Sequence, residues 1–471
     1  WGGHTCTHRR CLLSEREGEG AGGERDGKSA MPAAPPPVPV TVLRGHTSGV
    51  QASCYLNEDI LLTGSEDGVV KLWNLERRRA FAEFEATSHG MGVQRLDHLG
   101  RGKVVSQGRD MLIKVWDAES LAAGGGSGVG SPSRTTITPQ PLQVLPTGAF
   151  HFCQFALTRW REEARAKGNE STSSSSGGGG EHDDENNRGE RQGEEERSPP
   201  PGGQAGREGE AAESAPSTAA DDGEAQQGSF LSDESSFAEN VMLAPCGQQT
   251  LVSLWDLRKA RPSFTFAPKD AEQKGMVMCV RLLGESPSCA SPFAVVGHDA
   301  GHLCVYDLRA TSAEPLLESR LHKAPLLCVD VGSSCKQGVS GSADESINVF
   351  RLSTRKASSG GRLCGSCEVV KTFHLEHPGT SCVEIRRDQK MFVSGGWDHR
   401  VRAFSWKTPR PLAVLRSHEK NVHTVAYSPR IGGLVSGSGD SRVAVWELYP
   451  ERNPGGGGGS GRDDAMRDSR R

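Results

Sequence analysis

Residues 417–450 of this 471-residue chain, SHEKNVHTVAYSPRIGGLVSGSGDSRVAVWELYP, give the clearest indication of its fold. It contains three short runs in which apolar residues alternate with small or polar ones, and turn-forming residues separate the runs. This pattern predicts three antiparallel strands, the last of which ends in VAVWEL (443–448). The stretch also holds four residues at spacings that recur elsewhere in the chain: His418, Ser436, Asp440 and Trp446.

Runs similar to VAVWEL occur at seven places. They are KLWNL (71–75), IKVWD (113–117), VSLWDL (252–257), LCVYDL (303–308), INVFRL (347–352), VRAFSW (401–406) and VAVWEL itself. Their aromatic positions are separated by 43, 139, 51, 44, 54 and 42 residues, whereas a period of about 40 to 45 residues is typical of four-stranded repeats. The longest gap contains the low-complexity segments 122–134 and 159–236, and the 54-residue gap contains the loop 353–367.

Five of the repeats carry the same set of side chains, namely a His, a Ser or Thr, an Asp and an aromatic residue. The sets are His46, Thr63, Asp67 and Trp73; His89, Ser106, Asp110 and Trp116; His322, Ser340, Asp344 and Phe350; His377, Ser394, Asp398 and Phe404; and His418, Ser436, Asp440 and Trp446. We interpret each set as a hydrogen-bonded chain, in which the Asp holds the His, the His meets the hydroxyl, and the hydroxyl accepts from the indole N–H. Phe lacks that donor, so two of the chains end at the hydroxyl.

The same residue types also suggest a catalytic Ser-His-Asp triad. An enzyme needs one active site, whereas this arrangement recurs five times, so we favour a structural role and expect no catalytic residue. The third and fourth repeats depart from the pattern: Gln249 stands at the Asp position of the third, and Ala300 follows the displaced Asp299 in the fourth.

Seven four-stranded units predict an all-β fold, a seven-bladed β-propeller spanning residues 38–450. The seventh unit ends at its third strand. The segment VPVTVLRGH (38–46) resembles PLAVLRSH (411–418), the fourth strand of the sixth unit. We therefore expect the N-terminal segment to supply the last strand of the seventh blade and to close the ring.

Several segments are too poor in apolar residues to form a core, and we expect them to be disordered. These are residues 1–37, an acidic insertion at 159–236 within the third blade, and the tail 451–471. Residues 1–30 read as non-native sequence ahead of a start at Met31. The acidic insertion has 8 Lys and Arg against 19 Asp and Glu, although the whole chain has a net charge of only −4.

The composition also argues against several classes of function. A net charge of −4 argues against binding to nucleic acid or to an anionic membrane through bulk charge. Thirteen Cys in 471 residues are too dilute for a disulfide scaffold, and no apolar run approaches the roughly 18 residues needed to cross a bilayer. We expect a cytoplasmic or nuclear protein that is monomeric within a hetero-complex.

Several longer runs resemble a known family. SQGRDMLIKVWD (106–117), KGMVMCVRL (274–282) and the run from GGWDHRVRAFSW to HTVAYSP (395–429) are similar to WD-repeat proteins of the guanine nucleotide-binding protein subunit beta-like protein 1 family, related to the ASTRA-associated proteins. The resemblance implies a non-catalytic scaffold in co-chaperone assemblies that mature phosphatidylinositol-3-kinase-related kinases, or in chromatin-associated complexes. The alternative, a G-protein β-like signalling subunit, would need an N-terminal helix, which the Pro-rich residues 32–39 cannot form.

Three motifs suggest other chemistry. GGERDGKS (22–29) matches a P-loop pattern but lies in charged low-complexity sequence, and Cys364-x-x-Cys367 near His374 and His377 offers zinc-type ligands within an ordinary loop and strand. Ser232 precedes acidic residues in the manner of an acidophilic kinase site. For each motif we favour an ordinary loop or solvent-exposed segment, without a cofactor or a metal. A metal- or nucleotide-binding propeller enzyme is the weaker alternative.

The residue before each turn Asp is the candidate partner contact, because it lies where the turn meets the central channel. These positions hold Glu66, Arg109, Ala343, Trp397 and Gly439. Arg109 and Trp397 stand out, with Arg400 nearby, because exposed Arg and Trp most often dominate binding energy. The alternative is that Trp397 packs against a neighbouring blade and that Arg109 pairs with a carboxylate.

Overall fold

A computed structural model describes most of the repeat-bearing chain. The residues described are 37–100, 102–123, 135–148, 153–157, 241–245, 247, 249–257, 261–268, 270–283, 292–310, 313–356, 363–430 and 432–449. Residues 1–36, the acidic insertion at 159–236 and the tail 451–471 lie outside them, as do the P-loop-like motif and Ser232. The expectation of disorder there is therefore not addressed by the structure.

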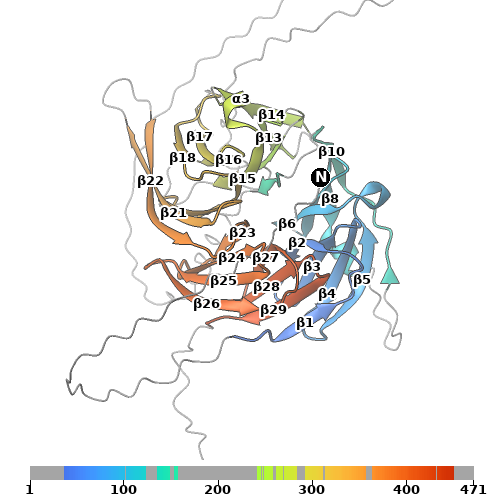
Figure 1. Ribbon diagram of the computed structural model, residues 1–471. Coiled ribbons are helices and arrows are strands. Elements are labelled where there is room, and N and C mark those ends of the chain that lie inside the picture. Colours follow the sequence, from blue (N-terminus) through green and yellow to red (C-terminus); the bar gives the residue numbers. More distant parts are fainter. Residues whose placement is uncertain are drawn as a thin grey trace, which may run out of the picture. The chain divides into compact units, whose positions relative to one another are not determined.

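The described strands form seven sheets that lie around a ring as its blades, and all but one of the strand pairs are antiparallel (Figure 1). Blades 1 and 2 contain β2 (Val50–Tyr55), β3 (Ile60–Ser65), β4 (Val69–Asn74) and β5 (Arg79–Glu85), then β6 (Val93–Gly100), β7 (Lys103–Gly108), β8 (Leu112–Asp117) and β10 (Gln143–Pro146). Blades 3 and 4 contain β11 (Ala156–Leu157), β12 (Val241–Pro245), β13 (Val252–Asp256) and β14 (Arg261–Phe266), then β15 (Val277–Leu283), β16 (Phe293–His298), β17 (His302–Asp307) and β18 (Leu317–Arg320). Blades 5 and 6 contain β19 (Leu326–Val331), β20 (Gln337–Ser342), β21 (Ser346–Lys356) and β22 (Leu363–His374), then β23 (Thr380–Ile385), β24 (Met391–Gly396), β25 (Arg400–Ser405) and β26 (Arg410–Arg416).

Blade 7 joins the two ends of the folded region. Its strands are β27 (Val422–Tyr427), β28 (Gly433–Ser438), β29 (Arg442–Glu447) and β1 (Thr41–Arg44). β1 pairs with β29 in the register Thr41↔Val445 to Arg44↔Arg442. The expected closure by the N-terminal segment, and with it the seven-bladed fold, is confirmed.

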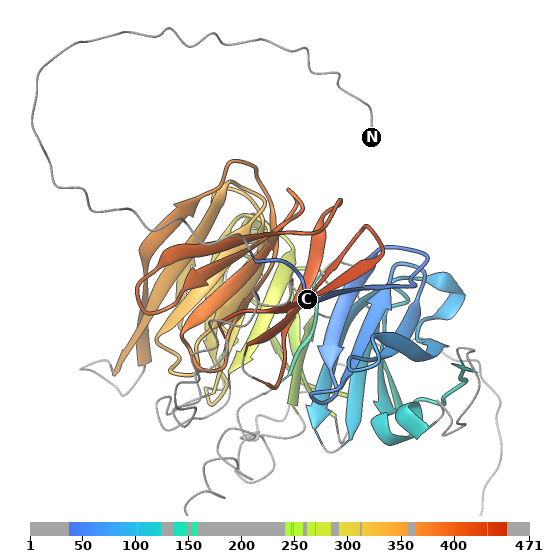
Figure 2. The ribbon, with the colours of Figure 1, turned by 90° about the horizontal axis from the view of Figure 1, so that it is seen from below.

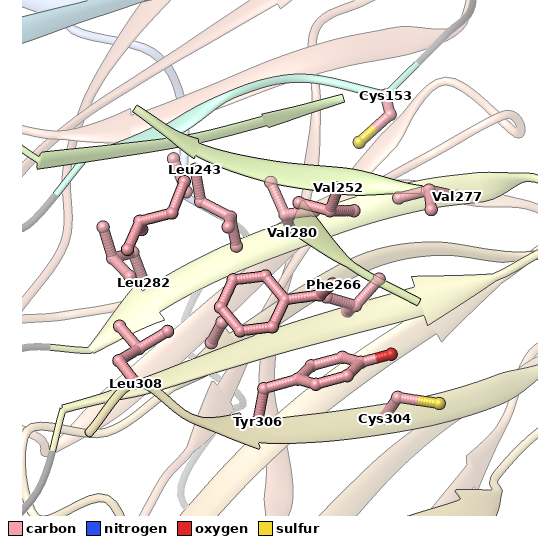
Figure 3. Close-up of a cluster of buried hydrophobic side chains, with 14 residues drawn as sticks. Cys153, Leu243, Val252, Phe266, Val277, Val280, Leu282, Cys304, Tyr306 and Leu308 are labelled. Carbon is pink, nitrogen blue, oxygen red and sulfur yellow. The ribbon is translucent and has the colours of Figure 1, made fainter. Parts of the chain in front are cut away.

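The core consists of seven apolar clusters among the described residues, one between each pair of adjacent blades. Between blades 3 and 4, for example, Phe266 of β14 packs against Tyr306 of β17, with ring centroids 4.9 Å apart (Figure 3). Each blade therefore buries one face against each neighbour, and no blade has a core of its own. Figure 2 shows the strands from the side, running from one face of the ring to the other.

A few elements lie outside this regular scheme. The helices in the described part of the chain are η1 (Ser88–Gly90), α1 (Ala118–Ala123) and α3 (Ala271–Lys274). The acidic insertion separates β11 from β12 of blade 3, and β9 (Thr135–Thr136) adds a fifth strand to blade 1. No helix in the described part of the chain combines the length and the hydropathy of a membrane span.

Candidate protein-interaction site

The candidate site is one face of the ring, which we call the loop face. Because strands alternate in direction, the turns between second and third strands lie at the same end as the loops that enter each first strand. The residue before each turn aspartate donates its N–H to such a loop, for example Glu66 to Gly49 O at 2.9 Å and Arg109 to Gly92 O at 3.0 Å. This bond fixes the turn beside the first strand, and the first strands of neighbouring blades, for example β2 with β6 and with β27, lie against one another.

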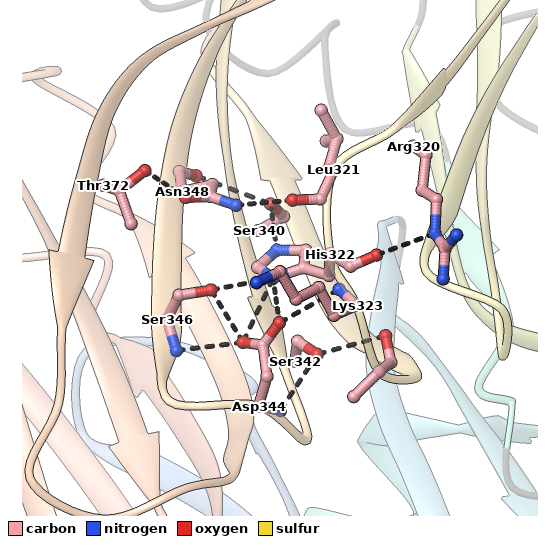
Figure 4. Close-up of polar contacts among 11 residues, drawn as sticks. Arg320, Leu321, His322, Lys323, Ser340, Ser342, Asp344, Ser346, Asn348 and Thr372 are labelled. Atoms are coloured by element: carbon pink, nitrogen blue, oxygen red, sulfur yellow. Dashed lines mark hydrogen bonds and ion pairs between the residues drawn. The ribbon is translucent and has the colours of Figure 1, made fainter.

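In blade 7, hydrogen bonds join all four side chains of the expected set. His418 Nδ1 lies 3.1 Å from Asp440 Oδ2, His418 Nε2 lies 2.8 Å from Ser436 Oγ, and Trp446 Nε1 donates to the same hydroxyl at 2.9 Å. In blade 5, His322 bridges Asp344 and Ser340 at 3.1 and 2.9 Å (Figure 4). Phe350 stands where Trp446 stands in blade 7, so the Ser340 hydroxyl receives no indole N–H, and it donates to Asn348 O at 3.5 Å.

The direction of these bonds follows from the ionisation of the groups. Burial lowers the pKa of His418, although Asp440 acts to raise it, so the imidazole is neutral and has one donor and one acceptor nitrogen. Burial acts to raise the pKa of Asp440, but the Glu419 N–H and His418 hold it below its usual value. The carboxylate can only accept, so Nδ1 donates to Asp440 and Nε2 accepts from Ser436.

Blade 1 satisfies its turn aspartate differently. Trp73 Nε1 donates to Thr63 Oγ1 at 2.7 Å, and His46 Nε2 lies 2.7 Å from the same oxygen. Asp67 accepts from the hydroxyls of Thr47 and Ser65. The loop and the turn are held together as in blade 7, with hydroxyl groups as the donors to the carboxylate.

Blade 2 uses a backbone group and a cation. Trp116 Nε1 donates to Ser106 Oγ at 2.8 Å, and Asp110 accepts from Ser88 N at 3.0 Å and from Lys114 Nζ at 3.3 Å. His89 lies in η1, and its side chain is outside the described part of the structure.

For blade 6 the prediction of a hydrogen-bonded chain through the histidine is wrong. His377 is exposed, and both carboxylate oxygens of Asp398 accept from the guanidinium of Arg402, from Nη1 at 3.0 Å and Nη2 at 2.5 Å. The loop histidine stands four residues before the first strand in blades 1, 2, 5 and 7, but His377 stands only three before Thr380. Glu376 therefore occupies the expected position, Ser394 stays buried at its usual place on the second strand, and Arg402 satisfies Asp398 as a bidentate partner.

Blades 3 and 4 lack the chain, as expected from their sequence. In blade 3, Trp255 is buried without a hydrogen-bond partner for Nε1 among the described residues, because Ala244 stands where the other blades have a hydroxyl. In blade 4, His298 is 0% exposed and replaces the serine found at that position in blades 1, 5 and 7. An ion pair between Lys274 and Glu318, 2.9 Å apart, lies nearby.

A β-bulge recurs at the second residue of six first strands, where one residue is skipped in the pairing with the second strand. Bulges re-aim side chains. The skipped residues are Gln51, Gln94, Met278, Leu327, Ser381 and His423. Five of these lie four or five residues after a loop histidine, so the repeat spacing alone identifies them.

One of the bulge residues, His423, lies near two of the candidate contact residues, and the sequence pattern did not single it out. Burial lowers the pKa of His423, while Glu66 acts to raise it and Arg109 to lower it, so both charged side chains lie within electrostatic reach of the imidazole. Glu66 also accepts from Gln51 Nε2 at 2.6 Å. Blades 7, 1 and 2 thus gather His423, Glu66 and Arg109 on the loop face, with Glu66 and Arg109 exposed.

The remaining contacts lie on blade 6. Trp397 is 40% exposed, and its indole lies over Gly379, where an added Cβ would come within 2.1 Å of the ring. Arg400 lies beside it and donates to Glu376 at 3.3 Å. Trp397 is therefore supported from one side by its own blade and presents the other side of the ring to solvent. Ala343 and Gly439 are half-buried.

The residues that suggested metal chemistry are spread apart. His374 and His377 are exposed, Cys367 is half-buried, and the side chain of Cys364 is outside the described part of the structure. Among the described residues, no group of three or more His, Cys, Asp or Glu side chains is placed to hold a metal ion. Cys279, Cys304, Cys328, Cys367 and Cys382 are free thiols.

The fold and repeats define the class of protein: the chain is a seven-bladed β-propeller that contains WD repeats. The family model described as "WD domain, G-beta repeat" matches residues 37–74 and 409–447, which flank the closure of the ring.

Curated relatives match most of the chain. "Guanine nucleotide-binding protein subunit beta-like protein 1" of Mus musculus is 26% identical over 423 residues, covering 88% of this chain and 98% of the mouse protein. "ASTRA-associated protein 1" of Aspergillus flavus is 25% identical over 430 residues, covering 86% of each chain. The protein of the same name from Schizosaccharomyces japonicus is 25% identical over 424 residues, covering 88% of this chain and 99% of the relative. The resemblance to these two groups is confirmed.

Proposed function

We propose that this chain is a non-catalytic adaptor that binds partner proteins through the loop face. The observation that carries the proposal is the pair of exposed side chains, Arg109 and Trp397, whose backbone N–H groups are bonded to the loops of their own blades. Arg and Trp are the side chains that most often anchor interfaces, and the Trp397 indole, which lies against Gly379, loses little conformational entropy on binding. Glu66 and Arg400 complete the proposed contact set.

The relatives support a more specific setting. Their names associate them with the ASTRA assembly or liken them to a G-protein β subunit. We propose that this chain serves in co-chaperone assemblies that mature phosphatidylinositol-3-kinase-related kinases, or in chromatin-associated complexes, within the cytoplasm or the nucleus. A G-protein β-like signalling role is the alternative.

Affinity purification of the full-length tagged chain from its own cells, followed by mass spectrometry, tests the proposal. The adaptor function predicts co-chaperone, kinase-assembly or chromatin subunits in amounts comparable to the chain itself. Recovery with a G-protein γ-type subunit would support the alternative, and recovery of the chain alone would contradict an adaptor function. Fractionation of the same cells shows the compartment.

A further inference from the structure

The outer edge of blade 1 is covered by a short strand from another part of the chain. β9 pairs in parallel with β5, in the register Ala82↔Thr135 and Glu83↔Thr136, and the N–H of Ile137 donates to Glu83 O at 2.9 Å. Among the described sheets this is the one with five strands. β5 is otherwise the outermost strand of its blade (Figure 1).

Few interactions hold this strand in place. It has two paired residues, and Ile137 is half-buried against the apolar cluster between blades 1 and 2. Thr136 and Thr138, on either side of Ile137, point to solvent. A short strand with one apolar anchor is among the parts of a protein that open most easily.

The residues beside the exposed threonines are acidic. Thr136 pairs with Glu83, and continuing the register by two residues places Thr138 beside the exposed Glu85. The nearest cation on β4, Lys71, is buried and already forms an ion pair with Glu83. A phosphate at Thr138 would therefore meet the like charge of Glu85, and Lys71, the cation on β4, is already paired with Glu83.

We propose that Thr138 is a phosphorylation site that releases residues 135–138 from blade 1. Pro139 follows Thr138 directly, which is the sequence that proline-directed kinases select. Such a kinase transfers the γ-phosphoryl group of ATP to Thr138 Oγ1: the O–H bond breaks, an O–P bond forms, and ADP and a proton leave. The phosphate repels Glu85 and Glu83, and β9 separates from β5.

Release would uncover the part of the β5 edge that β9 pairs with, at Ala82 and Glu83, and so leave the whole outer edge of β5 (Arg79–Glu85) unpaired. Exposed edges accept extended segments by strand addition, as β9 itself shows.

Hydrogen–deuterium exchange of the full chain, before and after treatment with a proline-directed kinase and ATP, tests the proposal. The peptide that contains β5 is expected to exchange about tenfold faster after phosphorylation of Thr138. Ile137→Ser, which removes the apolar anchor without adding charge, is expected to give the same increase. Thr138→Val is expected to remain protected after kinase treatment.

The turn of blade 6 offers a matched control, because Thr408 is also exposed and is followed by Pro409. Thr408→Glu is expected to leave the exchange of β5 unchanged, whereas Thr138→Glu increases it. If the kinase modifies Thr408 but not Thr138, or if phosphorylated Thr138 leaves β5 as protected as before, the proposal is wrong.

Discussion

Blades 6 and 7 carry the same His, Ser, Asp and aromatic spacing to within one residue, yet different partners hold their turn aspartates. In blade 7 a buried neutral imidazole bridges Asp440 and Ser436. In blade 6 a guanidinium holds Asp398 and the histidine is exposed. In both blades the turn carboxylate accepts from a buried donor, and in blade 6, where the histidine stands one residue nearer to the first strand, the guanidinium of Arg402 replaces the imidazole as that donor.

The largest effect is expected where blade 7 differs most from blade 6, in the origin of its fourth strand. Deleting residues 1–45 removes β1, leaves the β29 edge unpaired and exposes the cluster that contains Leu43. Thermal unfolding should then occur at a much lower temperature or give way to aggregation. Deleting residues 1–30 leaves β1 intact, and equal melting temperatures for the two truncations would refute the closure.

Removing the turn carboxylate should cost more in blade 6 than in blade 7. Asp398→Ala leaves the charge of Arg402, whose side chain is 11% exposed, without its partner, and breaking a buried ion pair costs about 3 to 5 kcal/mol. Asp440→Ala leaves a neutral imidazole without an acceptor, at a cost of about 1 to 3 kcal/mol. Urea denaturation of both variants measures the difference. An equal or reversed order would mean that Arg402 finds another partner or that His418 is charged.

The two histidines provide the sharper contrast. His418→Ala removes both bonds of the blade 7 chain and should destabilise the protein by about 1 to 3 kcal/mol. His377→Ala changes an exposed side chain and should alter stability by less than about 0.5 kcal/mol. If urea denaturation shows a similar loss of stability for both variants, the hydrogen-bonded chain that the sequence predicted for blade 6 would be present after all.

A smaller, pH-dependent effect is expected in blade 4. Burial lowers the pKa of His298 to about 4 from its ordinary 6.5, so between these values the unfolded chain binds more protons than the folded one. Stability should therefore fall as the pH falls below about 6.5, by about 1 kcal/mol between pH 7 and pH 5.5. His298→Ser, which introduces the residue of blades 1, 5 and 7, should flatten this part of the profile. An unchanged slope in that variant would assign the acid sensitivity to other groups.

The sequence was sufficient for the fold because its strongest signals repeat. Seven aromatic positions and an unpaired strand at each end of the folded region predicted both the blade number and the closure. The exposed position of His377 could not be predicted from the sequence, because its distance to Asp398 matches the corresponding distance in blade 1. Only the start of the first strand, at Thr380, reveals that His377 is shifted by one residue. The pairing of β9 with β5 involves two residues of β9, which is too short to give a recognisable strand pattern in the sequence.

The candidate site was predicted in part. Glu66, Arg109 and Trp397, which precede turn aspartates, are exposed, whereas Ala343 and Gly439 at the same position are half-buried. The approach of His423 to Glu66 and Arg109 depends on ring closure, which brings together residues more than 300 positions apart in the chain. No local pattern contains that information, although the bulge position after each loop histidine identifies the residues to inspect.

The central claim, that the loop face binds the partner, is tested most directly by the recovery of co-purified partner with an Arg109→Ala/Trp397→Ala double variant. The matched control is Arg430→Ala/Tyr449→Ala, which removes an exposed Arg and an exposed aromatic ring from the opposite end of blade 7. We predict that the first variant weakens partner binding by at least about 2 kcal/mol, roughly thirtyfold in affinity, at a nearly unchanged melting temperature, and that the control binds like the unmodified chain. Full partner recovery by the folded Arg109→Ala/Trp397→Ala variant would contradict the claim.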